Sequence, residues 1–372
     1  MIFAGMGAVL ARVAGATAQA APAGSGLWPP ALSLVIAGVI VVALMAYALL
    51  AGADFGGGVW DLLASGPRRG AQRALVAHAI GPIWEANHVW LIIVVVLLFS
   101  CFPVAFARLA VVLHIPFSLL LIGIVMRGSA FTFRTYDSAH SAVQERWGRL
   151  FAIASVATPV LLGMSVGAIV SEGVGQAPIG VPGATFAQQY LAPWLTPFAF
   201  AVGALALALF AFLAAVYLTV EAASDHAVQE DFRRRALLAA AAVFVTAAVA
   251  LGAAPLTAPR VRDALVLTVW AIPFHLVTGA VAVTAIAALL ARAYRLARVA
   301  AAAQVTLILS GWAIAQYPYI VPPTLTVAGA AAPHETLELV LVTLALGGLI
   351  LFPSLGYLYR VFKGRDAVGA KR

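Results

Sequence analysis

The stretch GPIWEANHVWLIIVVVLLF, residues 81–99, joins a polar beginning to a long apolar run. Glu85, Asn87 and His88 lie close together, Trp84 and Trp90 flank them, and the residues after Trp90 are apolar. About 20 apolar residues are enough for a helix to cross the hydrocarbon core of a bilayer. We therefore predict that this stretch begins a membrane-spanning helix and that its polar side chains face the bundle interior and a partner, away from lipid.

The composition of the whole chain agrees with a membrane protein. Hydrophobic residues make up 63% and charged residues 10%, against about 45–50% and about 25% in soluble domains. This predicts an all-α polytopic membrane protein. Apolar runs predict nine transmembrane helices, at 31–53, 81–104, 107–130, 149–171, 193–219, 236–256, 264–289, 299–320 and 336–359.

The basic residues predict the orientation of these helices. If the N-terminus is periplasmic, most of the 22 lysines and arginines fall in loops on the cytoplasmic side or in the C-terminal tail. These are Arg68, Arg69, Arg73, Arg127, Arg134, Arg146, Arg149, Arg233, Arg234, Arg235, Arg292, Arg295, Arg298, Arg360, Lys363, Arg365, Lys371 and Arg372. Such an asymmetry is typical of inner-membrane proteins. We therefore interpret the net charge of +8 as a topology signal, and not as a nucleic-acid binding patch.

The chain divides into three parts. Residues 1–30 form an N-terminal extension that is either signal-like or flexible, because small residues are interrupted by Arg12. Residues 31–363 form the transmembrane helix bundle, and residues 364–372 form a basic cytoplasmic tail. No phosphate-binding glycine-rich motif occurs in the sequence, which argues against ATP-driven chemistry in this chain.

Ionisable residues inside predicted spans are candidates for function because they are costly in lipid. Glu85 and His88 are three residues apart and so share a helix face, whereas Asn87 points towards a neighbouring helix. Asp54 follows Gly52 and precedes Gly56, a spacing that permits close approach of another backbone, and the glycines from Gly56 onward are expected to loosen the helix. Proton transfer is the functional interpretation. The alternatives are a structural Glu85–His88 pair and a helix-end role for Asp54.

Metal and haem chemistry receive less support from the residues. Glu85 and His88 have the spacing of one half of a di-iron site, but the second half is missing from the sequence. His114 and His275 lie on apolar stretches beside prolines, as haem ligands can, although satisfied structural histidines fit equally well. We expect no metal ligands in this chain. A secondary transporter remains the alternative class, although the inverted repeats typical of transporters are not evident.

The motifs resemble those of subunit II of the cytochrome bd-type quinol oxidases, including the cyanide-insensitive branch. The similarity rests on GADFGGG (residues 52–58), GPIWEANHVWLI (81–92), RGSAFTFR (127–134) and YPYIVPP (317–323) followed by HETLEL (334–339). The resemblance implies a haem-free subunit paired with a haem-bearing subunit I. That partner carries haem b together with haem d or a b variant, and a small single-helix subunit joins in some members. The complex oxidises quinol and reduces dioxygen to water in the bacterial inner membrane.

The resemblance also implies roles for particular residues. Glu85 matches an acidic position on a proton path towards the haems, Asp54 matches the second aspartate of a D-G-F-D motif, and His88 is a further candidate for that path. The first aspartate of that motif is Ala51 here, so the path is expected to be altered. Trp84, Asn87, Gly81 and Pro82 complete the motif around Glu85, and Trp90 matches a residue near the entrance of an oxygen channel.

Overall fold

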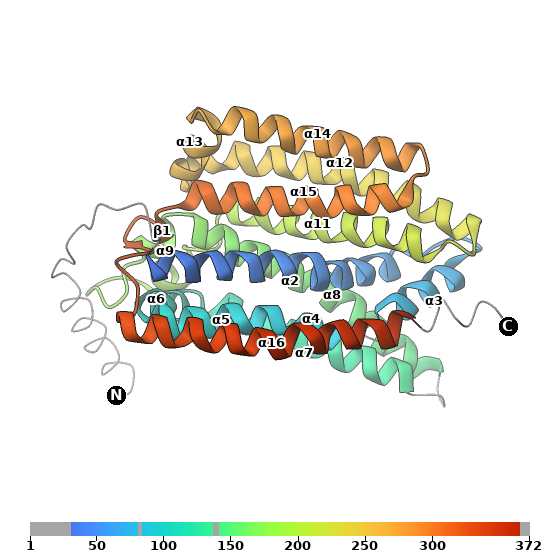
Figure 1. The fold of residues 1–372 in the computed structure, drawn as a ribbon, viewed down its shortest axis with the longest axis horizontal. Helices are drawn as coiled ribbons and strands as arrows, with labels where there is room; N and C mark the ends of the chain where they lie inside the picture. Colours follow the sequence, from blue (N-terminus) through green and yellow to red (C-terminus); the bar gives the residue numbers. More distant parts are fainter. Residues whose placement is uncertain (1–30, 81–83, 137–140, 365–372) are drawn as a thin grey trace.

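The computed structural model describes residues 31–80, 84–136 and 141–364, which form a bundle of roughly parallel and antiparallel helices (Figure 1). The helices are α2 (Leu32–Leu62), α3 (Arg69–Ile80), α4 (Trp84–Asn87), α5 (Val89–Cys101), α6 (Pro103–Val112), α7 (His114–Tyr136), α8 (Ser141–Val170), α9 (Gly173–Gln176), α10 (Phe186–Tyr190), α11 (Pro197–Glu221), α12 (His226–Thr257), α13 (Pro259–Leu267), α14 (Ala271–Leu290), α15 (Tyr294–Gln316) and α16 (His334–Gly364). Two short antiparallel strands, β1 (Tyr319–Val321) and β2 (Leu325–Thr326), lie between α15 and α16.

The helix lengths confirm an all-α polytopic fold. Among the described residues, eight helices are long and apolar enough to cross a membrane, and Arg69–Ile80 with Glu85–Cys101 forms a further candidate that is bent by 54°. The total therefore reaches the predicted nine when the bent pair is one span. Gly81 and Pro82 belong to the three residues between its two halves, which lie outside the described part of the chain.

Several predicted boundaries are wrong. The first helix continues to Leu62 instead of ending at residue 53, because packing against neighbouring helices outweighs the low helix propensity of glycine. The predicted helix 107–130 is divided between α6 and α7 at Leu113. Pro116 explains this break, because a proline has no amide hydrogen to donate to the carbonyl four residues earlier.

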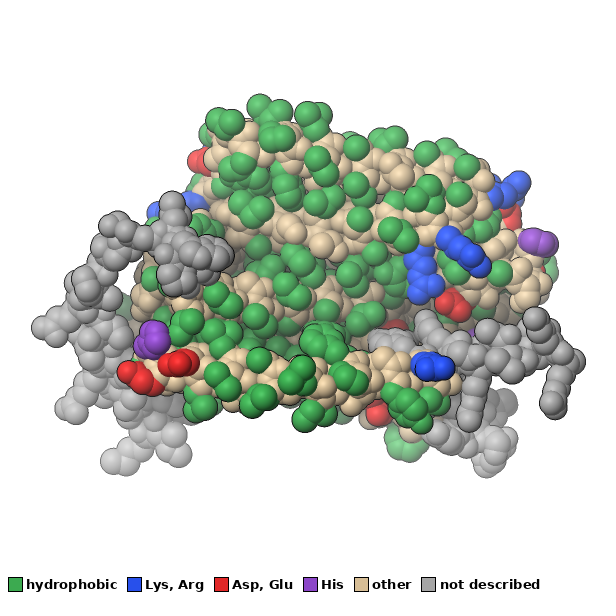
Figure 2. Space-filling view, viewed as in Figure 1, with side chains coloured by type: hydrophobic (Ala, Val, Ile, Leu, Met, Phe, Trp, Pro, Cys, Tyr) green, Lys and Arg blue, Asp and Glu red, His purple; other side chains and the backbone are tan. Residues whose placement is uncertain are grey.

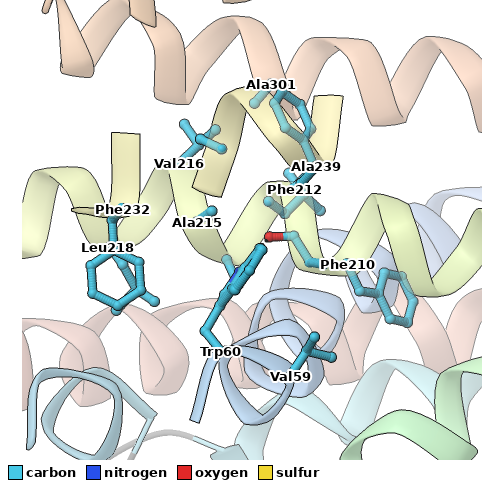
Figure 3. Close-up of a cluster of buried hydrophobic side chains, with 14 of the residues drawn as sticks. Val59, Trp60, Phe210, Phe212, Ala215, Val216, Leu218, Phe232, Ala239 and Ala301 are labelled. Atoms are coloured by element: carbon cyan, nitrogen blue, oxygen red, sulfur yellow. Dashed lines mark hydrogen bonds between the residues drawn. The ribbon is translucent and has the colours of Figure 1, made fainter. Parts of the chain in front are cut away.

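Helix α11 forms the centre of the bundle, with α2 and α8 on one side and α12 on the other (Figure 1). In its most apolar stretch 67% of the residues are buried, whereas the corresponding value for α16 is 0%. Figure 3 shows part of this core, with side chains from α2, α11, α12 and α15. The Trp60 indole of α2 lies against α11, and its Nε1 donates a 2.8 Å hydrogen bond to the Ala211 carbonyl. Helix α16 lies outside this core, against α2 and α5.

The connections sort to the two ends of the bundle as the charge pattern predicts. The C-terminal ends of α2, α7, α11, α14 and α16 lie together at one end of the bundle (Figure 1). Figure 2 shows blue Lys and Arg side chains at this same end. The opposite end carries the segments 171–196 and 317–333, and there Arg108 donates hydrogen bonds to the carbonyls of Val174, Gly175 and Ala177. Which end faces the cytoplasm stays a prediction.

Candidate functional site

Asp54 lies inside α2, in the interior of the bundle. Its exposed fraction is 7%, and eight further residues of the helix follow it. The helix-end interpretation of Asp54 is therefore wrong. The predicted close approach at the glycines is confirmed, because a Cβ on Gly56 would overlap the Phe210 carbonyl of α11. The expected loosening of the helix after Gly56 does not occur, since α2 is continuous through these glycines.

Asn87 connects the short helix α4 to α2. Its side chain is buried, with 1% exposed, and its Nδ2 donates a hydrogen bond to the carboxylate Oδ2 of Asp54. The prediction that Asn87 points to a neighbouring helix is confirmed. The chain turns between α4 and α5, where the His88 amide bonds to the Glu85 carbonyl at 3.2 Å. This turn directs Asn87 inward.

His88 also belongs to the polar interior of the bundle. It is half-buried, and its Nδ1 lies 3.4 Å from the hydroxyl oxygen of Tyr47, which is 1% exposed. The Phe55 ring packs edge-on against the His88 ring, at 6.0 Å between centroids. His88 thus packs against Phe55, the residue that follows Asp54 on α2.

Arg127 is the member of this site that the sequence analysis misplaced. The charge pattern predicts a cytoplasmic loop for Arg127, but it lies within α7 and is 2% exposed. Its Nη2 donates to the backbone carbonyl of Asp54 at 2.9 Å, and its Nε donates to the Ser155 hydroxyl at 3.3 Å. The guanidinium carbon also lies 4.6 Å from the centroid of the Phe55 ring.

A signal for this position existed, because residue 127 falls inside the predicted span 107–130. An arginine inside a span is a functional candidate by default. Its charge can be held there because the Asp54 carboxylate is near enough to attract it electrostatically and because two oxygens accept its hydrogen bonds. We call Asp54, Asn87, Arg127 and Ser155 the buried polar cluster.

The remaining motif residues lie outside this cluster. Glu85 is exposed on the surface of the chain, so the expectation that it faces the bundle interior is wrong for this chain by itself. Although Glu85 and His88 are three residues apart, Glu85 is exposed and His88 is half-buried. Trp84 begins α4. Trp90 is half-buried and its ring packs against that of Phe352 on α16.

Ala51, one turn before Asp54, is 1% exposed and lies in the apolar core. The position at which the family pattern places a carboxylate is therefore filled by a methyl group among hydrophobic neighbours. The buried polar cluster consequently contains one carboxylate on α2 and not two at this level of the helix.

The two histidines considered as haem ligands do not fit that role. His114 and His275 are both exposed on the outside of the bundle. The Nδ1 of His114 lies 2.9 Å from the Val111 carbonyl at the end of α6, and the Nδ1 of His275 lies 2.6 Å from the Ala271 carbonyl of α14. Among the described residues no group of three or more His, Cys, Asp or Glu side chains could hold a metal ion.

The buried polar cluster suits a proton, not a metal. A carboxylate, an amide, a guanidinium and a hydroxyl converge from α2, α4, α7 and α8, and an imidazole and a phenol lie next to them. Ionisable groups that face the interior of a helix bundle in this way are typical of proton relays in membrane proteins.

Fold and site together define a polytopic helical membrane protein with a charged cluster buried in its bundle. The chain belongs to the cytochrome bd terminal oxidase subunit II family, whose model matches residues 32–362. This match over nearly the whole bundle favours the oxidase interpretation over the transporter alternative.

Individual relatives are more distant. Cytochrome bd ubiquinol oxidase subunit 2 of Bacillus subtilis is 29% identical over 126 residues, which are 34% of this chain and 36% of that protein. A putative cytochrome bd menaquinol oxidase subunit II of the same organism is 33% identical over 87 residues, 23% of this chain and 25% of that one. The matched segments thus span about a third or less of these relatives.

Similarity of fold to a solved structure extends over much more of the chain than these sequence matches do. The structure of bd oxidase from Geobacillus thermodenitrificans contains a chain that superposes with a TM-score of 0.72 at 22% identity. The superposition covers 89% of this chain and 98% of that one. At this identity the likeness concerns the arrangement of helices.

Proposed function

We propose that this chain is subunit II of a membrane-bound quinol:oxygen oxidoreductase of the bd type. In this proposal it pairs with a haem-bearing subunit I in the bacterial inner membrane, with its N-terminus periplasmic and its C-terminus cytoplasmic. Haem b, together with haem d or a b variant, belongs to subunit I, and some members add a small single-helix subunit. The family match over residues 32–362 supports this proposal.

The role proposed for this chain is to help deliver protons from the cytoplasm, because reduction of dioxygen to water consumes protons as well as electrons. The observation that carries it is the burial of Asp54 with Asn87 and Arg127 inside the bundle. Asp54 and His88 act inside this chain. Glu85, on the exposed surface, acts where subunit I covers it and passes protons to that partner.

Because Ala51 stands where the family pattern implies a carboxylate, this path has one carboxylate fewer than that pattern. We propose that the Tyr47–His88 contact at 3.4 Å takes part in the path in its place. Trp90 is proposed to lie near the entrance of an oxygen passage, since its ring covers the contact between α5 and α16.

The test compares Asp54→Asn and Glu85→Gln in the complex isolated from its native membrane, with haem content measured for each sample. In the Asp54→Asn variant the amide oxygen of the new side chain can still accept the bond from Asn87, so this hydrogen bond is kept while the titratable group is removed. Each variant is expected to lower quinol-driven oxygen uptake by about tenfold or more. Glu338→Gln, which changes an exposed carboxylate (side chain 68% exposed) at the start of α16, is the control.

Normal oxygen uptake by both variants in a fully haem-loaded complex would reject the proton-path role. Isolation of the chain from its native membrane without a haem-bearing partner would reject the oxidase assignment itself. Loss of the complex in the variants, with normal activity per remaining haem, would assign these residues to assembly instead.

A further inference from the structure

One carboxylate at the basic end of the bundle is surrounded by three arginines. Glu230, in the first turns of α12, binds Arg233 through two hydrogen bonds of 2.6 and 2.9 Å. Arg234 approaches it to 3.5 Å and Arg292, from the turn between α14 and α15, approaches to 3.6 Å. Three positive charges around a single negative charge leave a local excess of positive charge.

The other carboxylates of this region are already engaged. Asp231 accepts two bonds from Arg68 and one from Gln72, Asp225 caps the N-terminus of α12, and Glu221 lies 3.7 Å from Arg298. None of these acids pairs with Arg234 or Arg292 within the described residues. The side chains of these two arginines are 72% and 68% exposed, so a ligand from outside can reach them.

The backbone positions of Arg292 and Arg295 are unusual for arginine. Arg292 has a φ of 58°, the left-handed conformation that ends many helices and that glycine adopts with less strain. Arg295, three residues later, lies in the first turn of α15, a turn without acidic residues, although helix N-termini favour negative charge. The position of Arg295 is therefore unfavourable for a positive charge unless an anion is bound there.

Exposed apolar surface lies next to these arginines. Leu238 is one helical turn after Arg234 on α12 and is 70% exposed, and Leu290 precedes Arg292 on α14 and is 60% exposed. Figure 2 shows blue side chains at this end of the molecule, next to green apolar surface that continues along the bundle. The charges therefore stand where a membrane-spanning surface ends.

We propose that Arg234, Arg292 and Arg295 bind the phosphate headgroup of an anionic phospholipid, whose acyl chains lie along the exposed apolar surface of α12 and α14. A phosphate oxygen supplies the negative charge that Glu230 alone does not provide, and guanidinium groups bind phosphate through paired hydrogen bonds. Basic pockets between transmembrane helices bind anionic lipid headgroups by this chemistry. The inference does not depend on the proton-path role.

The binding is measured by native mass spectrometry of the complex isolated from its native membrane, titrated with phosphatidylglycerol or with phosphatidylcholine of the same acyl chains. Phosphatidylglycerol is expected to bind more tightly to the unmodified complex. Arg295→Gln is expected to weaken it about fivefold, and the double variant Arg234→Gln/Arg292→Gln about 25-fold. Arg295 has no ion-pair partner within the described chain, so its substitution leaves the fold intact.

Arg69→Gln is the matched control, because it removes one exposed positive charge at the same end but on α3, and it is expected to leave phosphatidylglycerol affinity unchanged. Equal affinity for the two lipids, or unchanged affinity in the double variant, would overturn the proposal. Displacement of the lipid by inorganic phosphate at equal concentration would also overturn it, since the site would then recognise a free anion and not a lipid.

Discussion

At the scale of single residues, the buried polar cluster depends on the pairing of Arg127 with Asp54. A guanidinium that is 2% exposed inside a helix bundle has to be compensated, because a single buried charge costs several kcal/mol. Here the compensation comes from the attraction of the Asp54 carboxylate and from bonds to the Asp54 carbonyl and the Ser155 hydroxyl. The guanidinium and the carboxylate therefore each lower the free-energy cost of burying the other.

Arg127→Met tests this pairing. The substitution leaves the Asp54 carboxylate buried without its main positive neighbour, so we expect a loss of about 3–5 kcal/mol in stability, measured as detergent-induced or thermal unfolding of the isolated complex. The double variant Asp54→Asn/Arg127→Met is expected to be more stable than the Arg127→Met single variant, because no unpaired charge remains. If the two single losses simply add in the double variant, the residues do not interact.

At the scale of helices, the contact of α2 with α11 depends on glycine at particular positions. A Cβ on Gly52 would come within 2.6 Å of the Phe210 ring, and one on Gly56 would overlap the Phe210 carbonyl. Small residues of this kind let helices approach closely enough for van der Waals packing in a membrane. Asp54, between the two glycines, points to another side of α2, where Asn87 of α4 donates a hydrogen bond to it.

Gly56→Ala is expected to destabilise the bundle by about 1–3 kcal/mol, because the added methyl group forces α2 away from the backbone of α11. Gly38→Ala is the control on the same helix: its Cβ would meet nothing within 4 Å, so the substitution should be neutral or slightly stabilising. Thermal unfolding of both variants provides the comparison. Equal melting temperatures would show that the α2–α11 contact relaxes without cost.

At the scale of the whole molecule, the loops alternate between two ends because successive long helices run in opposite directions through the bundle. The basic residues collect at the end that holds the C-terminal ends of α2, α7, α11 and α14. The other end holds the folded segments 171–196 and 317–333, which contain no Lys or Arg. The positive-inside asymmetry predicts that the basic end is cytoplasmic.

Cysteine labelling checks this orientation. In a Cys101→Ser background, a membrane-impermeant maleimide applied to right-side-out spheroplasts should label Val181→Cys, which changes an exposed residue of the segment after α8. It should label Ser224→Cys, in the exposed turn after α11, only when the membrane is opened. The reverse pattern would invert the topology, and labelling of both from one side would contradict the passage of α11 across the membrane.

Composition, apolar run length and the spacing of arginines were enough to predict a polytopic helical protein of about nine spans. These properties depend on local hydrophobicity, which is a property of each segment by itself. The motif around Glu85 and Asn87 likewise identified the region of the site. Asn87 was correctly predicted to point to another helix, because neighbouring positions on a helix face different directions.

Which residues form the site depends on packing between helices that are far apart in the sequence. Arg127 could be interpreted as a loop residue or as an interior one, and only its burial between α2 and α8 distinguishes the two. Glu85 is predicted to face the bundle interior and a partner; it is exposed on this chain, and whether a partner covers it stays a prediction. Local pattern predicts which segments are helices, but the burial of a charge is set by the partners that other helices bring to it.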